Sequence, residues 1–195
     1  MSMILSISGS PRRGGNTEIL LEAAVQPFVE AGHQIETFHL SDKKVGPCIA
    51  CEKCATDGVC FIDDDMPELL AKIRVCDGVI VGSPVYNRNL TAQLQAVFNR
   101  FHSVIKKRPL QGRMVFGGAI AVGGAPNSQG IVLNTLYNFL LSLGACCVPG
   151  ALNGVSVVAR EKGVVRDQPK SLQDARILGE NLEKVVSACG GRPSS

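Results

Sequence analysis

Short, almost wholly apolar runs alternate along the chain with longer stretches in which apolar residues recur at the helical period. Five such β/α units in sequence predict a parallel sheet with helices on both faces. Strand runs without polar alternation are typical of sheets buried on both sides. The expected strands are 3–8, 34–40, 78–82, 114–122 and 146–150, the last with a continuation at 155–159, and the expected helices are 17–31, 66–75, 91–106, 129–143 and 171–187.

The composition indicates one globular domain spanning residues 1–195. A chain of 195 residues with 45% hydrophobic and 19% charged residues is long enough for a full core and too short for two large domains. The net charge of +3 is small and scattered, and the chain has two tyrosines and no tryptophan with which to stack on bases. We therefore expect no nucleic-acid partner.

Two apolar segments are interpreted as buried secondary structure rather than as targeting or membrane segments. Residues 3–8 lack the basic region and the long apolar region of a signal peptide. The segment 114–159 carries no charged residue, but glycine pairs, Pro126 and Pro149 interrupt it. Eight cysteines without a secretion signal indicate reduced thiols. We expect a cytoplasmic protein without membrane contact, in which 114–159 is buried and contributes to a subunit contact.

The loop after the first expected strand, residues 8–17, has the composition of a phosphate site. Its glycines let the backbone fold close around an anion, and the following helix offers unpaired N–H groups. Arg12 or Arg13 adds charge, and further hydrogen-bond donors are Ser8, Ser10, Asn16 and Thr17. A nucleoside-triphosphate site needs Lys-Ser/Thr where Gly15-Asn16 stands, and the dinucleotide pattern is absent. This loop fits the phosphate of flavin mononucleotide (FMN); the alternative is a capped loop that binds nothing.

A second unusual segment is the insertion at residues 41–64, which is much longer than a usual connection in such a fold. It carries a C-x2-C-x2-C-x5-C pattern formed by Cys48, Cys51, Cys54 and Cys60. Bacterial ferredoxins use the first two spacings for a [4Fe–4S] cluster, whereas structural zinc sites usually pair two separate knuckles. The spacing favours the iron–sulfur cluster and leaves open zinc, a thiol redox site and a metal-free loop.

Two further loops follow the third and fourth expected strands and reach the same edge of the sheet. A proline-stiffened turn with a tyrosine suits a flat heteroaromatic ring, although a Ser-Pro turn and a helix cap explain it almost as well. Its residues are Pro84, Val85, Tyr86 and Asn87. In the other loop, Gly123 and Gly124 permit close backbone approach to a ligand or form an ordinary tight turn.

The remaining polar residues form no recognisable catalytic group. The three histidines, His33, His39 and His102, are dispersed, and no hydrolase motif is present. The aspartates at 63–65 fit a cap for the helix at 66–75 better than a cation site. We therefore assign no catalytic side chain and expect chemistry centred on a flavin.

The glycine-rich loop at 9–17, the cysteine run before residues 64–66 and the turn at 82–86 together resemble the iron–sulfur flavoproteins within the NADPH-dependent FMN reductase group. The likeness covers roughly residues 1–150 and implies a flavodoxin-like, doubly wound, five-stranded parallel sheet with the cysteine-rich insertion after strand two. By this resemblance, the FMN phosphate and ribityl chain are held by Ser8, Ser10, Arg12, Asn16 and Thr17; the flavin ring is framed by Pro84, Val85, Tyr86, Asn87, Gly123 and Gly124; and the [4Fe–4S] ligands are Cys48, Cys51, Cys54 and Cys60.

The sequence departs from the group at two places beside the expected flavin ring. Residues 87–89 read Asn-Arg-Asn where many relatives have an aromatic residue and a glycine. The loop after the fourth strand reads Pro-Asn-Ser at 126–128, without the histidine and the further glycine pair common in the group. The resemblance therefore does not carry over a substrate preference.

Three functional hypotheses follow. The leading one is an FMN-dependent oxidoreductase that passes electrons between a reduced donor, FMN and a [4Fe–4S] cluster, with a redox partner protein or a small molecule such as a quinone as acceptor. The second is a cluster-free NAD(P)H-dependent FMN or quinone reductase, and the third is a non-enzymatic module that binds zinc or senses oxidants. Without a dinucleotide fingerprint, NAD(P)H would bind transiently over the flavin. The resemblance also implies a homo-oligomer, either a dimer or a tetramer.

Overall fold

A computed structural model describes residues 1–101 and 114–189 of the chain. In these residues six parallel strands form one sheet in the order β2-β1-β3-β4-β5, and β6 also pairs with β4. The strands are β1 (Met3–Ser8), β2 (Gln34–His39), β3 (Gly78–Pro84), β4 (Phe116–Gly123), β5 (Cys146–Cys147) and β6 (Val155–Val158). The order confirms the doubly wound, flavodoxin-like arrangement expected from the sequence.

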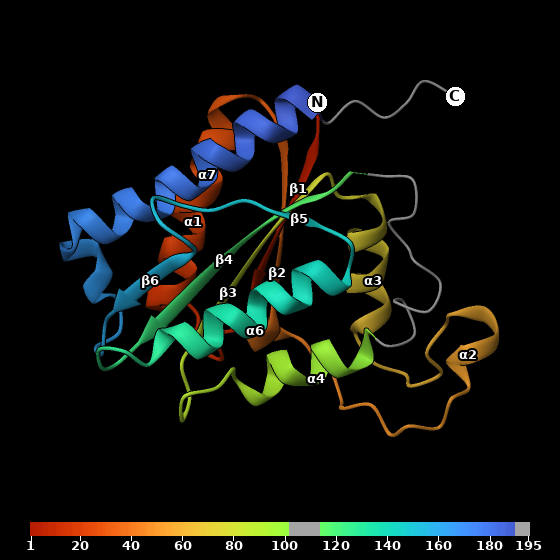
Figure 1. Cartoon of the computed structure of the whole chain (residues 1–195). Helices are drawn as coiled ribbons and strands as arrows, with labels where there is room; N and C mark the ends of the chain where they lie inside the picture. Colours follow the sequence, from red (N-terminus) through yellow and green to blue (C-terminus); the bar gives the residue numbers. More distant parts are fainter. Residues whose placement is uncertain (102–113, 190–195) are drawn as a thin grey trace.

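Helices cover both faces of the sheet, as Figure 1 shows. On one face, α1 (Asn16–Glu30) and α7 (Pro169–Cys189) share an apolar cluster with the sheet. On the other face, α3 (Met66–Val75), α4 (Ala92–Arg100) and α6 (Gln129–Ser142) share a second cluster. The central strands β1, β3 and β4 are buried almost throughout, which explains why their sequences lack polar alternation. The shorter helices are η1 (Leu40–Asp42), α2 (Cys54–Asp57) and η2 (Val164–Asp167).

The fifth strand position differs from the sequence prediction of one strand at 146–150. β5 contains only Cys146 and Cys147, which pair with the start of β4, and β6 pairs with the end of β4. Pro149 lies between them and has no N–H to donate to a sheet ladder, so the chain leaves the sheet and returns at Val155. The expected continuation at 155–159 is thus the strand that reaches the carboxyl edge.

The helix boundaries agree with the sequence prediction to within two residues, apart from the helix expected at 91–106. The described part of that helix is Ala92–Arg100, and residues 102–106 lie outside the described residues. The N-cap residue of α3 is Asp65, which makes no side-chain cap, and the preceding Asp64 carboxylate accepts a hydrogen bond of 3.1 Å from the Met66 N–H. Among the described residues, no helix is both long and apolar enough to cross a bilayer.

The strand register brings four loops to one edge of the sheet. Ser8 at the end of β1 lies beside Gly82 of β3, and Pro84 at the end of β3 lies beside Val122 of β4. Val122 in turn lies beside Val157 of β6. The loops after β1, β3, β4 and β6 therefore converge at the carboxyl ends of the strands, where ligands bind in sheets of this type.

Candidate functional site

The converging loops enclose a cavity of about 210 Å³, here called the first hollow. The loop after β1 and the start of α1 provide much of its wall, and the loops after β3, β4 and β6 provide the rest. Its lining residues are Ser10, Arg12, Gly15, Asn16, Thr17, Pro84, Val85, Tyr86, Val122, Gly124, Ala159, Arg160 and Lys162. Eight of the residues predicted from the sequence as FMN contacts are in this set.

The N-terminus of α1 opens into the first hollow without a side-chain cap. Gly15 is the N-cap residue, and no side chain accepts a hydrogen bond from the first turn. The first intrahelical bond runs from the Ile19 N–H to the Gly15 carbonyl, at 3.1 Å. The N–H groups that precede it are those that every helix leaves unpaired, and they carry the positive end of the helix dipole. This arrangement suits a phosphate group.

The hydroxyl of Ser10 shapes this loop from within. It accepts a hydrogen bond from the Arg12 N–H at 3.1 Å and lies 3.2 Å from the Arg12 carbonyl, so it holds a tight local turn. The loop is also tied to its neighbours, since the Gly9 N–H donates to the Gly82 carbonyl at 2.8 Å. The Thr91 hydroxyl donates to the Gly9 carbonyl at 2.7 Å. The backbone around the first hollow is therefore fixed by β3 and by the start of α4.

The two adjacent arginines of the loop point to different surroundings. Arg13 pairs with Glu18 at 3.0 Å and approaches Asp42 at 3.7 Å, and it does not line the first hollow. His39 belongs to the same charged group, and burial together with the charge of Arg13 lowers its pKa. Arg12 lines the first hollow and makes no ion pair with any described residue. The structure thus separates a structural arginine from one that is available to a ligand.

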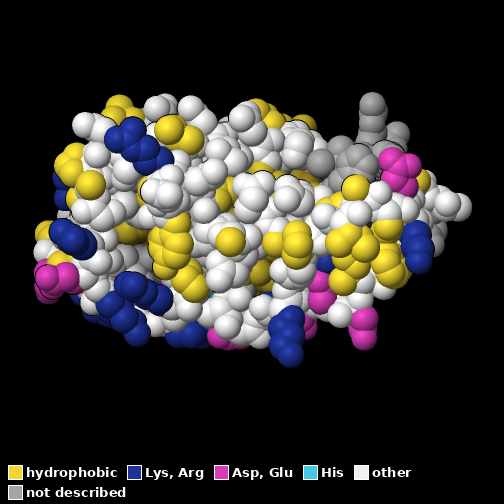
Figure 2. Space-filling view, turned by 90° about the horizontal axis from the view of Figure 1, so that it is seen from below, with side chains coloured by type: hydrophobic (Ala, Val, Ile, Leu, Met, Phe, Trp, Pro, Cys, Tyr) yellow, Lys and Arg dark blue, Asp and Glu magenta, His cyan; other side chains and the backbone are white. Residues whose placement is uncertain are grey.

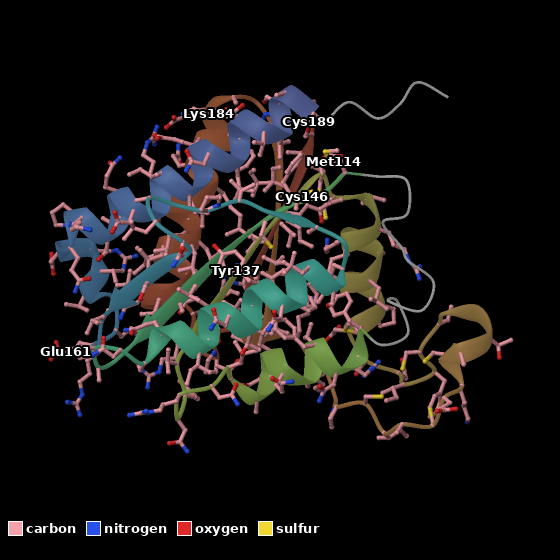
Figure 3. The ribbon with its side chains drawn as sticks, in the orientation of Figure 1. Met114, Tyr137, Cys146, Glu161, Lys184 and Cys189 are labelled. Carbon is pink, nitrogen blue, oxygen red and sulfur yellow. The ribbon has the colours of Figure 1, made fainter. Side chains whose placement is uncertain are left out.

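The first hollow has a cationic rim formed by Arg12, Arg160 and Lys162, and no aspartate or glutamate lines it. Figure 2 shows Lys and Arg side chains gathered toward the left of the molecule, the end at which Figure 3 labels Glu161. Asn16 connects this rim to α1, because its side-chain amide donates to the Glu161 carbonyl at 2.7 Å. A cationic lining that contains no carboxylate favours an anionic ligand.

The cysteine loop, residues 46–64, lies at the opposite end of the molecule, where Figure 1 labels α2. Cys48 and Cys51 are exposed, Cys54 and Cys60 are partly exposed, and all four are free thiols. The Ala50 N–H approaches the Cys48 sulfur at 3.4 Å, and Ala50 and Glu52 have positive φ angles of 54° and 57°. Within residues 1–101 and 114–189, however, no three potential metal ligands are already gathered into a site.

The comparisons with known proteins agree on one family. The model of the NADPH-dependent FMN reductase family matches residues 2–158. An iron–sulfur flavoprotein of Methanocaldococcus jannaschii is 37% identical over 192 residues, covering 94% of this chain and 96% of its own. An iron–sulfur flavoprotein of Methanosarcina thermophila is 41% identical over 124 residues, covering 64% of each chain. The crystal structure of a WrbA-like flavodoxin from Agrobacterium tumefaciens superposes with a TM-score of 0.68 at 15% identity, covering 97% of this chain and 99% of that one.

The chain belongs to the NADPH-dependent FMN reductase family. It is accordingly an FMN-dependent oxidoreductase. Family membership favours the two enzymatic hypotheses over the non-enzymatic zinc or redox-sensing module. The first hollow fits the cofactor of this family on its own features, since it combines an uncapped helix N-terminus, a rim of cations and a half-exposed tyrosine, Tyr86.

Three of the predicted FMN contacts lie outside the first hollow. Ser8 is 1% exposed within β1. Gly123 faces the side chains of the next loop, since a Cβ there would lie 2.4 Å from the Ser128 hydroxyl, so this glycine is needed for packing. Asn87 lines a separate, adjoining cavity.

Sequence reasoning missed the residues that follow β6. Ala159, Arg160 and Lys162 line the first hollow, although none of them was predicted as a cofactor contact. The signal was present, because the expected strand continuation at 155–159 places Arg160 and Lys162 directly after a strand end. Residues at that position reach the ligand edge of a parallel sheet.

Proposed function

We propose that the chain is an iron–sulfur flavoprotein with FMN in the first hollow and a [4Fe–4S] cluster in the cysteine loop. The observation that carries the flavin part is the uncapped N-terminus of α1, which opens into a cavity lined by three cations and no carboxylate. When bound, FMN would supply two-electron chemistry and the cluster single-electron transfer.

In this proposal the residues of the chain bind and orient the cofactors. The first-turn N–H groups of α1, the Thr17 hydroxyl and the Arg12 guanidinium would hold the phosphate. Val85, Tyr86 and the backbone at Gly124, which line the β3 and β4 side of the cavity, would hold the flavin ring. No aspartate, glutamate or histidine lines the first hollow, so its lining offers no carboxyl or imidazole as an acid or base.

The cluster ligands in this proposal are Cys48, Cys51, Cys54 and Cys60. The donor set fits, because the four thiols are free and at least partly exposed and a backbone N–H already approaches the Cys48 sulfur. Metal binding would have to draw the four thiols together, which is common when a metal orders its own loop.

The flavin site and the cysteine loop lie far apart in the folded chain, and this separation supports electron transfer that involves a partner. Glu161, beside the cationic rim, and α2, in the cysteine loop, lie at opposite ends of the molecule (Figures 1 and 3). The cysteine loop also exposes Ile49, Val59 and Phe61, which are 60%, 56% and 49% exposed. Figure 2 shows hydrophobic side chains grouped at that end. We propose that a second copy of the chain, in a dimer or tetramer, or a redox partner covers this surface.

The test is anaerobic purification followed by flavin analysis, iron analysis and absorbance spectra before and after dithionite. The proposal expects one FMN and about four irons per chain, with both flavin and cluster bands bleached on reduction. Protein that takes up no FMN on titration would overturn the flavin site. Protein that binds FMN but contains no iron would overturn the cluster alone.

The second candidate is a cluster-free NAD(P)H-dependent FMN or quinone reductase, favoured by the finding that no described metal-ligand group is already assembled. Cys51→Ala separates the two candidates. In an iron–sulfur flavoprotein this change removes iron and one-electron transfer to an acceptor protein, whereas in a cluster-free reductase it leaves NAD(P)H–quinone turnover intact. Cys189→Ala is the matched control, since this exposed cysteine lies at the end of α7 and outside the cysteine loop.

A further inference from the structure

A second hollow of about 680 Å³ adjoins the first and has not been given a role above. It shares three lining residues with the first hollow: Val85, Gly124 and Arg160. Its other walls are the turn after β3 and the loop after β4, and its remaining lining residues are Asn87, Arg88, Ala125, Pro126, Asn127 and Ser128. A molecule in the second hollow would therefore lie directly beside whatever occupies the first.

The turn that carries Arg88 has an unusual backbone. Tyr86 and Asn89 exchange two main-chain hydrogen bonds of 2.9 Å, which closes a two-residue turn. The two residues at its tip, Asn87 and Arg88, have positive φ angles of 53° and 64°. Positive φ at both positions defines a type I′ turn, which strongly prefers asparagine and glycine. Arginine is disfavoured in this conformation, and disfavoured backbone conformations cluster at binding and catalytic sites.

The charge of the second hollow has one sign. Arg88 and Arg160 line it, and no aspartate or glutamate does. Within the described residues, 1–101 and 114–189, neither arginine makes an ion pair. Many other cations of the chain are paired, as Arg13 is with Glu18 and Arg176 with Glu30. Two unpaired guanidinium groups on one cavity suit a carboxylate, sulfonate or phosphate, which arginine binds through paired hydrogen bonds.

We propose that the second hollow is an anion subsite, in which Arg88 and Arg160 bind the negatively charged group of the molecule that exchanges electrons with the flavin. The inference rests on the proposed flavin site, and it assigns a substrate class to that site: an electron donor or acceptor that bears a carboxylate, sulfonate or phosphate. The subsite lies between the turn that carries Asn87 and Arg88 and the loop at 124–128.

The test uses the FMN-loaded protein and two matched pairs of electron carriers. The acceptors are 1,4-naphthoquinone and its 2-sulfonate, and the donors are NADH and NADPH, which differ by one phosphate. The variants are Arg88→Gly, Arg160→Gln and the double change. Glycine suits the positive φ of residue 88, so this variant removes the charge without imposing backbone strain. Lys184→Gln is the control, because it removes one exposed positive charge on α7, far from the site in Figure 3.

For each pair we take the ratio of two kcat/KM values, that of the more charged carrier divided by that of the less charged one. In the double variant this ratio should fall about tenfold. The fall should be carried mainly by KM and should shrink at high salt. A fall in the quinone pair alone assigns the subsite to an acceptor, and a fall in the nicotinamide pair alone assigns it to the phosphate of the donor. Ratios that match those of Lys184→Gln in both pairs overturn the proposal.

A parallel FMN titration, followed by quenching of flavin fluorescence, keeps the two proposals distinguishable. Variants that bind FMN as the parent protein does, yet leave the ratios unchanged, overturn the anion subsite and leave the flavin site standing. Loss of FMN binding in Arg160→Gln would assign Arg160 to the flavin phosphate and overturn its role here. A parent protein that binds no FMN would overturn both proposals.

Discussion

Arg100 at the end of α4 and Asp64 at the end of the cysteine loop form a bidentate ion pair with N–O distances of 2.7 and 3.1 Å. Only 1% of the Arg100 side chain and 8% of the Asp64 side chain are exposed. The same guanidinium also donates to the Gly46 carbonyl at 3.1 Å, at the N-terminal end of the cysteine loop. Burial alone would raise the pKa of Asp64, but Arg100 and the N–H groups of Gly46 and Met66 hold that pKa below its usual value. The pair closes the cysteine loop at its base.

Removing the arginine should destabilise the protein strongly, because it leaves Asp64 charged and buried. We expect Arg100→Met to lower the free energy of unfolding by about 3–5 kcal/mol, measured by denaturant titration. Lys170→Met is the control, since it breaks a pair of 2.9 Å with Asp174 in which the lysine side chain is 89% exposed. That change should cost only about 0–1 kcal/mol. Equal losses in the two variants would contradict the argument.

Tyr137 on α6 should titrate far above the usual range of tyrosine. Its hydroxyl is buried without a hydrogen-bond partner among the described residues, and burial, with a contribution from Cys147, raises its pKa from 10.0 to about 12. Since the folded state holds this proton more tightly, the resulting stability is complete below pH 10.0 and is lost as the pH rises toward 12. The tyrosinate absorbance should show a component near 12 that Tyr137→Phe removes. If that component persists in the variant, the assignment is wrong.

The sequence predicted what depends on local pattern and missed what depends on distant partners. The helix at 66–75 was predicted with both of its boundaries, because Asp64 and Pro67 mark its start within a few residues. The break between β5 and β6 depends on which strand pairs with the end of β4. Arg160 and Lys162 were missed although the expected strand continuation at 155–159 places them directly after a strand end. The phosphate contact of Asn16 stays a prediction; its amide also bonds a carbonyl 145 residues away, which no local spacing reveals.

The neighbouring arginines of the β1–α1 loop provide a matched test of the flavin site. Arg12→Gln should weaken FMN binding about tenfold, because it removes a charge that lines the first hollow. Arg13→Gln makes the same chemical change one residue away, but Arg13 is paired with Glu18 and lies outside the hollow. The FMN dissociation constant of Arg13→Gln should stay within about twofold of the parent value, because salt screens the interaction of a surface charge with a ligand that it does not contact. Both constants are measured by titration of the flavin fluorescence. A larger effect of Arg13→Gln than of Arg12→Gln would refute the assignment of Arg12 to the flavin site.

Asn16 should hold the rim of the first hollow in place. Its amide donates to the Glu161 carbonyl at 2.7 Å and to the Ala159 carbonyl at 3.4 Å, and its oxygen accepts from the Val165 N–H at 3.4 Å. Asn16→Ala removes all three bonds, so the loop that carries Arg160 and Lys162 should open more often. We expect trypsin to cleave after these two residues about tenfold faster, as followed by mass spectrometry.

The control for this experiment is a second asparagine with a similar role elsewhere. The Asn181 amide donates to the carbonyls of Pro149 and Gly150, at 3.0 and 3.3 Å, on a loop without lysine or arginine. Asn181→Ala therefore loses comparable hydrogen bonds without freeing the rim, and cleavage after Arg160 and Lys162 should stay at the parent rate. If both variants are cleaved equally fast, general destabilisation explains the result. Faster cleavage in Asn16→Ala alone, suppressed when FMN is added, would tie the rim to the bound cofactor, because a ligand that binds only the closed loop reduces the population of the open one.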